Sequence, residues 1–584
     1  MGDLPAGPAT PGGGGVDPAR APQAEPAEPA KPAEPAKPAK PAGPAGQRPV
    51  SRRAAGGALT ALAALLVLGA LLAPDDFGGL SAGTFLRLPV EALAAAVLLV
   101  LLPPGPRRVA AVAGGVLLGL LTVLRLVDLG FSAVLGRPFD LVLDWGLLGD
   151  ATGVVADSLG RLGAAGAVAG ALLLVAGVLV VTTLATLRLA SVAARHDTAA
   201  LRTVAVLAVV WVAAALLGAP VAARSTAALV ADRADQVRTG LHDRQVFAAE
   251  AGVDRFAGVP GNRLLAGLHG KDVIVTFVES YGRSAIEDPE FAPGVDSVLD
   301  AGTRRLAAAG YGARSAFLTS STVGGGSWLA HATLLSGLWV NTEQRYRALV
   351  SGDRLTLPAL FGRAGWRTVS VEPAIDRPWP EGRFFGYQQA YDSRTLGYRG
   401  PRFSYATMPD QYTFATFQRR ERAPDHPPVM AEITLVSSHS PWTPLPRLVD
   451  WDAVGDGSVF ADPAHRVGGP ASGVLGSPGR VRTAFRQSVE YSLSALISYV
   501  LEYGDDDLVL VFLGDHQPAP VVTGAGAGAD VPITVVARDR AVLDRITGWG
   551  WDPGLNPGPA APVWRMDRFR DRLLTAFARP GSAP

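Results

Sequence analysis

Five apolar stretches in the first 222 residues constrain this chain more than any other feature of its sequence. Most are close to the ~20 residues that a helix needs to cross ~30 Å of hydrocarbon. Arg87 and Glu91 make the second stretch the weakest. A single such stretch could be a buried core helix, but five in succession favour a membrane domain with five transmembrane helices over 54–222. The stretches lie at roughly 54–73, 86–103, 108–127, 161–187 and 201–222.

The charges between these stretches predict their orientation. Lys and Arg precede the first stretch, Asp75 and Asp76 follow it, and Arg107 and Arg108 follow the second. The third connection is mainly acidic and the fourth is basic. Basic loops stay in the cytoplasm, so we expect a cytoplasmic N-terminus. Five crossings then place everything after about residue 223 outside a cell membrane.

The first 50 residues have a composition unlike the rest. They repeat Pro and Ala with Lys and Glu, which cannot build a core, so we expect a disordered cytoplasmic tail over 1–50. The net charge of the whole chain is +1, which gives no reason to expect a nucleic-acid partner. The chain contains no Cys, which excludes disulfides, thiolate metal sites and a Cys nucleophile.

After a linker over 223–269, residues 270–584 read as a soluble α/β domain. Short apolar runs, such as 272–280 and 508–513, alternate with helical segments such as 486–504. Continuous apolar strands joined by helices predict a mostly parallel central sheet covered by helices. Ligands of such sheets bind outside the carboxyl ends of the strands.

Acids and imidazoles stand where several of these strands end. Glu279 ends the first strand, His439 follows a middle strand, and Asp515 and His516 end the run "LVLVFLG". Carboxylate oxygen and imidazole nitrogen suit Zn²⁺, Mn²⁺ or Fe²⁺. Taken alone, Asp515 and His516 are more typical of a helix N-cap Asp beside a surface His. Together with Glu279, they favour a metal site.

A glycine run precedes a candidate nucleophile. Residues 324–326 are all Gly, and Ser327 then opens the helical segment "SWLAHATLLS". The glycines allow close approach of a ligand, and a hydroxyl at the positive end of a helix favours a bound phosphate. The alternative is an ordinary Ser N-cap, and Ser321 and Thr322 are competing hydroxyls. For His331, on the same segment, we expect a structural role.

These residues resemble the alkaline phosphatase/sulfatase superfamily. The sulfatase nucleophile is followed by x-P-S-R-x-x-L-L-T-G, and Ser327 occupies its position in "SWLAHATLLSG". Leu329 and His331 stand where that pattern has Pro and Arg. Because those two residues guide conversion of the nucleophile to formylglycine, the resemblance implies an unmodified serine here.

The chain is more similar to the membrane branch of lipoteichoic acid synthase-type phosphoglycerol transferases, which have five spans and one extracellular catalytic domain. The similarity covers about 270–540 and the spans. The nucleophile of that branch is usually Thr, and Ser keeps its oxygen. The resemblance implies a divalent metal, with Mn²⁺ expected and Zn²⁺ or Mg²⁺ as alternatives, held by Glu279, Ser327, Asp515 and His516.

The same resemblance assigns the substrate site and the reaction. Trp379 and Arg383 would bind the phosphate, and His439 would contact the phosphoryl or leaving group. The implied enzyme transfers a phosphoglycerol-type headgroup from a membrane phospholipid to a cell-envelope glycan or glycolipid through phospho-Ser327. The alternatives are a phosphoethanolamine transferase, a membrane phosphodiesterase or sulfatase-like hydrolase, and a non-catalytic envelope binding module.

Overall fold

A computed structural model describes residues 48–73, 87, 89–135, 137–141, 144–217, 226–403, 405–470, 472–524 and 526–579. Of the tail expected to be disordered over 1–50, residues 1–47 lie outside the described residues, as do Asp75 and Asp76, whereas residues 48–50 begin helix α1. The chain divides into two compact units, Met1–Gly57 and Ala58–Pro584. The first contributes only the start of helix α1 to the described part, and the second holds everything discussed below.

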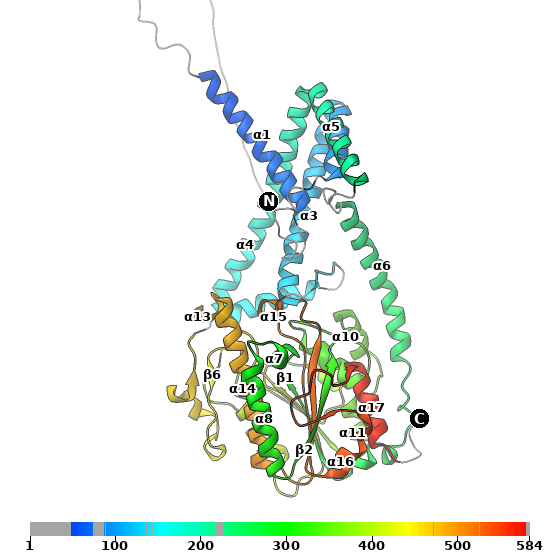
Figure 1. The fold of residues 1–584 in the computed structure, drawn as a ribbon, viewed down its shortest axis with the longest axis vertical. Helices are drawn as coiled ribbons and strands as arrows, with labels where there is room; N and C mark the ends of the chain where they lie inside the picture. Colours follow the sequence, from blue (N-terminus) through cyan, green and yellow to red (C-terminus); the bar gives the residue numbers. More distant parts are fainter. Residues whose placement is uncertain are drawn as a thin grey trace, which may run out of the picture. The chain divides into compact units, whose positions relative to one another are not determined.

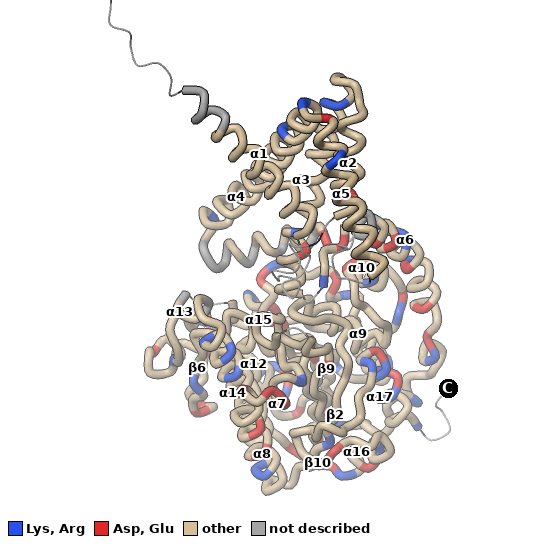
Figure 2. Tube along the Cα trace, turned by 45° about the horizontal axis from the view of Figure 1, so that its top comes forward, with Lys and Arg blue, Asp and Glu red and all other residues tan. Residues whose placement is uncertain are grey.

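The apolar stretches form helices (Figure 1). Four are long and apolar enough to cross a membrane: Ala54–Leu72, Pro104–Leu135, Gly160–Arg195 and Asp197–Leu216. The second stretch forms only the 12-residue helix α2, about 18 Å long at 1.5 Å per residue. Figure 2 shows helices α1 to α5 with charges mainly near their ends. The helices are α1 Arg48–Leu72, α2 Val90–Leu101, α3 Pro104–Leu135, α4 Trp145–Arg195, α5 Asp197–Leu216 and α6 Thr226–Ala251.

Contacts between these helices fix their relative directions. The Arg125 guanidinium of α3 donates to the carbonyls of Ala70 and Leu71, at the end of α1. Arg188, near the end of α4, donates to Thr60 of α1. Because α3 and α4 are antiparallel neighbours, α1 and α3 run in the same direction. Helix α2 must therefore return between them, which is the direction that five crossings require; the number of spans stays a prediction.

The α/β part is built on a nine-stranded sheet in the order β10-β2-β9-β8-β1-β5-β3-β4, with β11 beside β2. Strands β8, β1, β5, β3 and β4 are mutually parallel, whereas β9 and β2 join antiparallel. The predicted mostly parallel sheet is confirmed. The strands are β1 Asp272–Val278, β2 Gly312–Thr319, β3 Arg367–Glu372, β4 Gln389–Asp392, β5 Val429–Leu435, β8 Leu508–Gly514, β9 Asp530–Ala537, β10 Asp552–Pro553 and β11 Val563–Arg565; β6 Leu445–Pro446 pairs β7 Arg466–Val467 separately.

Helices cover both faces of the sheet, as the unbroken apolar strands predict. Ile274 and Val278 of β1 pack into one core with α8, α12 and α14. Val275 and Phe277 point to the opposite face and pack with α9, α11, α16 and α17, because side chains alternate along a strand. The helices are α7 Ser284–Glu287, α8 Ala292–Ala308, α9 Ser327–Ser336, α10 Glu343–Val350, α11 Leu357–Arg363, α12 Asp410–Glu421, α13 Ser472–Leu475, α14 Pro478–Tyr503, α15 Pro520–Thr523, α16 Arg540–Arg545 and α17 Phe569–Phe577.

The segment expected to be a linker also contributes to this core. Helix α6 fills the first part of it, and Phe247 near the end of α6 is buried. Leu264, Leu265 and Leu268 are buried with it against the face covered by α9 and α11. Part of the segment assigned to a linker therefore packs into the α/β core.

Candidate active site and metal centre

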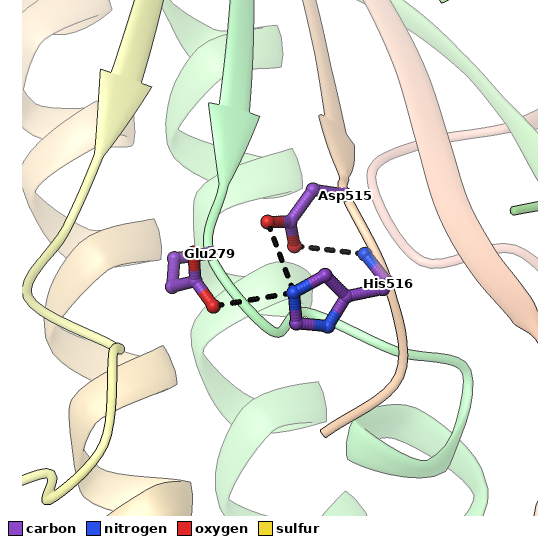
Figure 3. Close-up of side chains that lie close together, drawn as sticks. All are labelled: Glu279, Asp515 and His516. Atoms are coloured by element: carbon purple, nitrogen blue, oxygen red, sulfur yellow. Dashed lines mark hydrogen bonds and ion pairs between the residues drawn. The ribbon is translucent and has the colours of Figure 1, made fainter. Parts of the chain in front are cut away.

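The register of the parallel strands brings the predicted metal ligands to one edge. Val278, the last residue of β1, pairs with Leu435 of β5 and with Gly514 of β8. The residues that follow these positions leave the sheet side by side. Glu279 therefore meets Asp515 and His516, as Figure 3 shows. The three side chains are buried and offer ligand atoms within 4.8 Å of one another.

Ser327 completes this cluster from the start of α9. Its hydroxyl donates to Glu279 Oε2 at 3.1 Å and lies 3.2 Å from His516 Nε2. The same Nε2 atom is 3.5 Å from Glu279 Oε1 and 3.4 Å from Asp515 Oδ2. The four predicted metal-binding residues are thus brought together by segments up to 237 positions apart (279 to 516).

The orientation of the His516 ring is set by its own chain. Nδ1 lies 2.8 Å from the carbonyl oxygen of Gln517, so Nδ1 carries the proton and donates it to that oxygen. Nε2 then presents a lone pair to two carboxylates. Three acceptors facing one point repel one another, and a cation between them removes that repulsion.

Asp515 also presents a buried acceptor atom that a cation would satisfy. Its Oδ1 accepts hydrogen bonds from the backbone N–H groups of Ser280 and His516, at 2.7 and 2.8 Å. Its Oδ2 is buried and receives no hydrogen bond within the described residues. A buried carboxylate oxygen without a donor is costly unless a cation binds it. Two carboxylates, an imidazole and a hydroxyl form a donor set that fits a divalent metal.

The protonation tendencies reflect excess negative charge in the cluster. Burial, and then the charge of Glu279, raise the pKa of Asp515 to about 6. Burial opposes ionisation of Glu279, yet His439 and His516 lower its pKa to about 2. Burial lowers the pKa of His516, but Asp515 and Glu279 outweigh it and raise that pKa overall. A bound cation would take over the role of these shared protons.

The glycine run before Ser327 is required by its surroundings. Gly324, Gly325 and Gly326 all have positive φ angles, of 75°, 156° and 76°. A Cβ atom at Gly324 would lie 1.9 Å from the carbonyl oxygen of Val134, at the end of α3. Only glycine fits this close approach, and it lets α9 begin at Ser327 beside Glu279.

The competing hydroxyls are engaged elsewhere. Thr322 Oγ1 donates to the carbonyl of Gly325 at 2.5 Å, and Ser321 Oγ accepts from Thr333 at 2.9 Å. Neither makes a polar contact with the metal-binding carboxylates among the described residues. Ser327 is therefore the hydroxyl that the fold places at the site.

The three predicted substrate residues differ in their positions. His439 follows β5, stacks on Tyr405 with ring centroids 3.6 Å apart, and acts electrostatically on Glu279. Trp379 packs at the rim of the core beside Phe385, at 5.8 Å between centroids. Arg383 is exposed, and no hydrogen bond or ion pair joins it to the cluster within the described chain. The substrate roles of all three stay predictions.

Sequence reasoning missed a second buried cluster. His331, Glu372 and Glu432 lie within 4.8 Å of one another on the face of the sheet that α9 covers. The signal was present, since Glu432 interrupts the apolar strand "VMAEITL" and Glu372 ends β3. The expected structural role of His331 gave no indication of these partners.

No protein-family model and no curated protein matches the chain. Three solved structures illustrate what its fold is similar to. Lipoteichoic acid synthase LtaP from Listeria monocytogenes is 14% identical over 55% of this chain and 74% of its own, with a TM-score of 0.36. An alkaline phosphatase superfamily protein from Vibrio parahaemolyticus is 14% identical over 57% and 74%, at 0.35. The soluble domain of lipooligosaccharide phosphoethanolamine transferase A from Neisseria meningitidis is 13% identical over 54% and 92%, at 0.34.

Proposed function

We propose that this chain is a membrane-anchored, metal-dependent phosphotransferase. In the finer form of the proposal, it moves a phosphoglycerol-type headgroup from a phospholipid to an acceptor hydroxyl of an envelope glycan or glycolipid. The observation that carries the proposal is the position of Ser327 Oγ, 3.1 Å from Glu279 Oε2 and 3.2 Å from His516 Nε2. A hydroxyl held between an acid and an imidazole is arranged for nucleophilic attack.

Glu279, Ser327, Asp515 and His516 would hold the divalent ion, with Mn²⁺ expected. When bound there, the ion supplies Lewis-acid chemistry that favours the ionised serine hydroxyl and neutralises phosphoryl charge. Glu279 accepts the hydrogen bond of the serine hydroxyl and so directs its oxygen. The Nδ1–H bond of His516 to Gln517 holds that ring in place.

Two displacements at phosphorus account for the transfer. In the first, Ser327 Oγ loses its proton and bonds to phosphorus, the bond from phosphorus to the diacylglycerol oxygen breaks, and that oxygen takes up a proton. In the second, the acceptor hydroxyl loses its proton and bonds to phosphorus, and the serine oxygen leaves and takes up a proton. The two steps together conserve protons and need no other reactant.

Two further groups support these steps. Ser327 begins the ten-residue helix α9, whose first two N–H groups, those of Ser327 and Trp328, can donate to the phosphoryl oxygens, whereas that of Leu329 donates to Gly326. His439 lies at the same edge, only partly buried, and acts on Glu279. We assign it the delivery of a proton to the leaving oxygen, with Arg383 and Trp379 binding the headgroup.

The apolar helices have a physical use in this scheme. A donor phospholipid is confined to a membrane leaflet, and a catalytic domain tethered to the same membrane meets it at high effective concentration. We propose that the α/β part faces the outside of the cell and that the N-terminus lies in the cytoplasm.

The test is mass spectrometry of the purified full-length protein after incubation with phosphatidylglycerol vesicles and Mn²⁺. We expect a glycerophosphoryl adduct on the peptide that contains Ser327 and release of diacylglycerol. Ser321→Ala is the matched control and should keep both. An adduct that persists in Ser327→Ala, or no adduct in the wild-type protein with any phospholipid headgroup, would contradict the proposal. Headgroup release into water without transfer would instead favour a hydrolase.

A further inference from the structure

The second buried cluster is assembled by register and helix packing. Glu432 of β5 pairs with Ser370 of β3, so Glu372, two residues later, lies on the same face of the sheet as Glu432. Helix α9 covers this face and places His331 over it, one turn beyond Ser327. The His331 ring stacks on Phe277 with centroids 3.7 Å apart and planes 12° apart, which fixes its position.

The polar atoms of this cluster face one another without satisfying one another. His331 Nδ1 and Glu432 Oε1 are 3.0 Å apart, yet Oε1 receives no hydrogen bond of acceptable geometry. His331 Nε2 and the Thr434 hydroxyl are buried and also have no hydrogen-bond partner among the described residues. The side chain of Glu432 is only 2% exposed and that of His331 is 12% exposed.

This spacing is that of two ligands on one ion. Two donor atoms, each about 2.1 Å from a cation and about 90° apart, are separated by about 3 Å. The alternative for this pair is an ion pair with a protonated His331, but Glu432 Oε1 receives no hydrogen bond of acceptable geometry. The remaining oxygens are held in place, because Ser370 donates to Glu372 Oε1 at 3.0 Å and Tyr387 donates to Glu432 Oε2.

The charge balance of the cluster leads to the same conclusion. Two buried carboxylates share one imidazole, and within the described chain neither Glu372 nor Glu432 forms an ion pair with Lys or Arg. His331 can balance one of the two carboxylates through its ion pair with Glu432, and the second buried carboxylate needs a further counter-charge, which a divalent cation supplies.

We propose that His331, Glu372 and Glu432 bind a second divalent cation, of the Zn²⁺ or Mn²⁺ class, with the Thr434 hydroxyl as a further ligand. This site is separate from the one formed by Glu279, Asp515 and His516. It joins α9 to β3 and β5, and so fixes the helix that presents Ser327. The inference does not rest on the proposed function, since a structural ion would bind whether or not the chain transfers phosphoryl groups.

The test is the metal content of the purified full-length protein after saturation with Mn²⁺ and removal of excess ion. We expect two bound ions in the wild-type protein. One should remain in Asp515→Ala, and one in Glu372→Gln/Glu432→Gln. Glu421→Gln, which alters a buried glutamate paired with Arg367, is the matched control and should keep both.

The proposal can still be tested if the variant Glu372→Gln/Glu432→Gln does not fold. In Asp515→Ala, electron paramagnetic resonance during Mn²⁺ titration should still show one tightly bound ion. No bound ion in that variant, or unchanged stoichiometry in a folded Glu372→Gln/Glu432→Gln protein, overturns the proposal. In that case protons rather than a cation neutralise the cluster. An empty first site with a filled second site would refute the proposed function and leave this inference standing.

Discussion

Two buried clusters with the same types of side chain lie on one sheet, and they differ in what surrounds them. Each contains two carboxylates and one imidazole within 4.8 Å. The first stands at the carboxyl edge of β1 and β8 and includes the partly exposed hydroxyl of Ser327. The second, the enclosed cluster of His331, Glu372 and Glu432, lies between α9 and the sheet, where His331 stacks on Phe277 and Tyr387 donates to Glu432.

This difference indicates that the types of metal-ligating side chain alone do not determine whether a cluster is a reaction centre. Both clusters offer atoms that suit the same cations, but only the first places a hydroxyl at the start of a helix, next to open loops. We therefore assign a catalytic role to the edge cluster, which consists of Glu279, Ser327, Asp515 and His516. To the enclosed cluster we assign a structural role. The predictions below test that division.

The largest expected effect is that of Ser327→Ala. Removing the proposed nucleophile should lower turnover by about 10³-fold or more, because the covalent route would be lost. Diacylglycerol release from phosphatidylglycerol vesicles measures it, with Ser321→Ala as control. Turnover within a few-fold of the wild-type rate would remove the distinction between the two clusters.

Asp515→Ala should have the second-largest effect. It removes a direct ligand, so the loss of metal affinity should exceed the about 100-fold that an outer-shell change costs. Turnover should fall with it, while circular dichroism shows a folded protein. Wild-type metal content in this variant would mean that the edge cluster is not the catalytic metal site.

Glu372→Gln/Glu432→Gln should affect stability more than chemistry. An ion present at 100 times its dissociation constant stabilises the fold by about 2.7 kcal/mol. Thermal unfolding with and without a chelator should show this difference in the wild-type protein and not in the variant. A variant as inactive as Ser327→Ala, but still folded, would make the enclosed cluster catalytic.

The two clusters should fill in different pH ranges. Metal binding must displace protons, so affinity falls as pH drops through the pKa of each ligand. Asp515 has its pKa raised to about 6 by burial and by Glu279, whereas Glu372 reaches about 7. Burial lowers the pKa of His331, but Glu432 outweighs it and raises that pKa to about 8.

Affinity at the enclosed site should therefore drop by about tenfold per pH unit for each proton retained, beginning near pH 8. The edge site should lose affinity in two steps, first as His516 takes up a proton at its raised pKa and then as Asp515 does so near pH 6. Manganese titrations of Asp515→Ala and of Glu372→Gln/Glu432→Gln at several pH values separate the two curves. Identical curves would show that the clusters do not differ in this way.

Arg383→Ala should have the smallest effect. The side chain is exposed, so we expect KM for the lipid to rise by less than about tenfold with kcat nearly unchanged. Steady-state kinetics on vesicles measures the two constants separately, with exposed Arg394→Ala as control. A kcat loss of 100-fold would show that Arg383 reaches the reacting phosphate.

The edge cluster could be predicted from the sequence because each of its residues follows a recognisable local signal. Glu279 follows the largely apolar strand 272–278 and Asp515 follows the run "LVLVFLG", and parallel strands meet at one edge. Ser327 follows three glycines that introduce a helix. Each signal lies within a short stretch of sequence, and the pairing of parallel strands then brings the distant stretches together.

The enclosed cluster could not be found in the same way. Glu432 lies inside a strand, and its partners come from a helix about 100 residues earlier and from another strand. Nothing in the local pattern shows that β3 and β5 are neighbours in this register. The antiparallel pairing of β2 with β9 escaped prediction for the same reason, because strand order is set by packing across the whole domain.

The hydrogen bond from the His516 ring to the carbonyl of Gln517 spans a single peptide link. Because donor and acceptor are in adjacent residues, the orientation of the His516 ring does not depend on the length or sequence of more distant loops. Descendants of this chain could therefore acquire new acceptors by altering the loops after β3 and β5, while the end of β8 is inherited intact. We expect evolutionary changes in substrate preference to arise from substitutions in those loops.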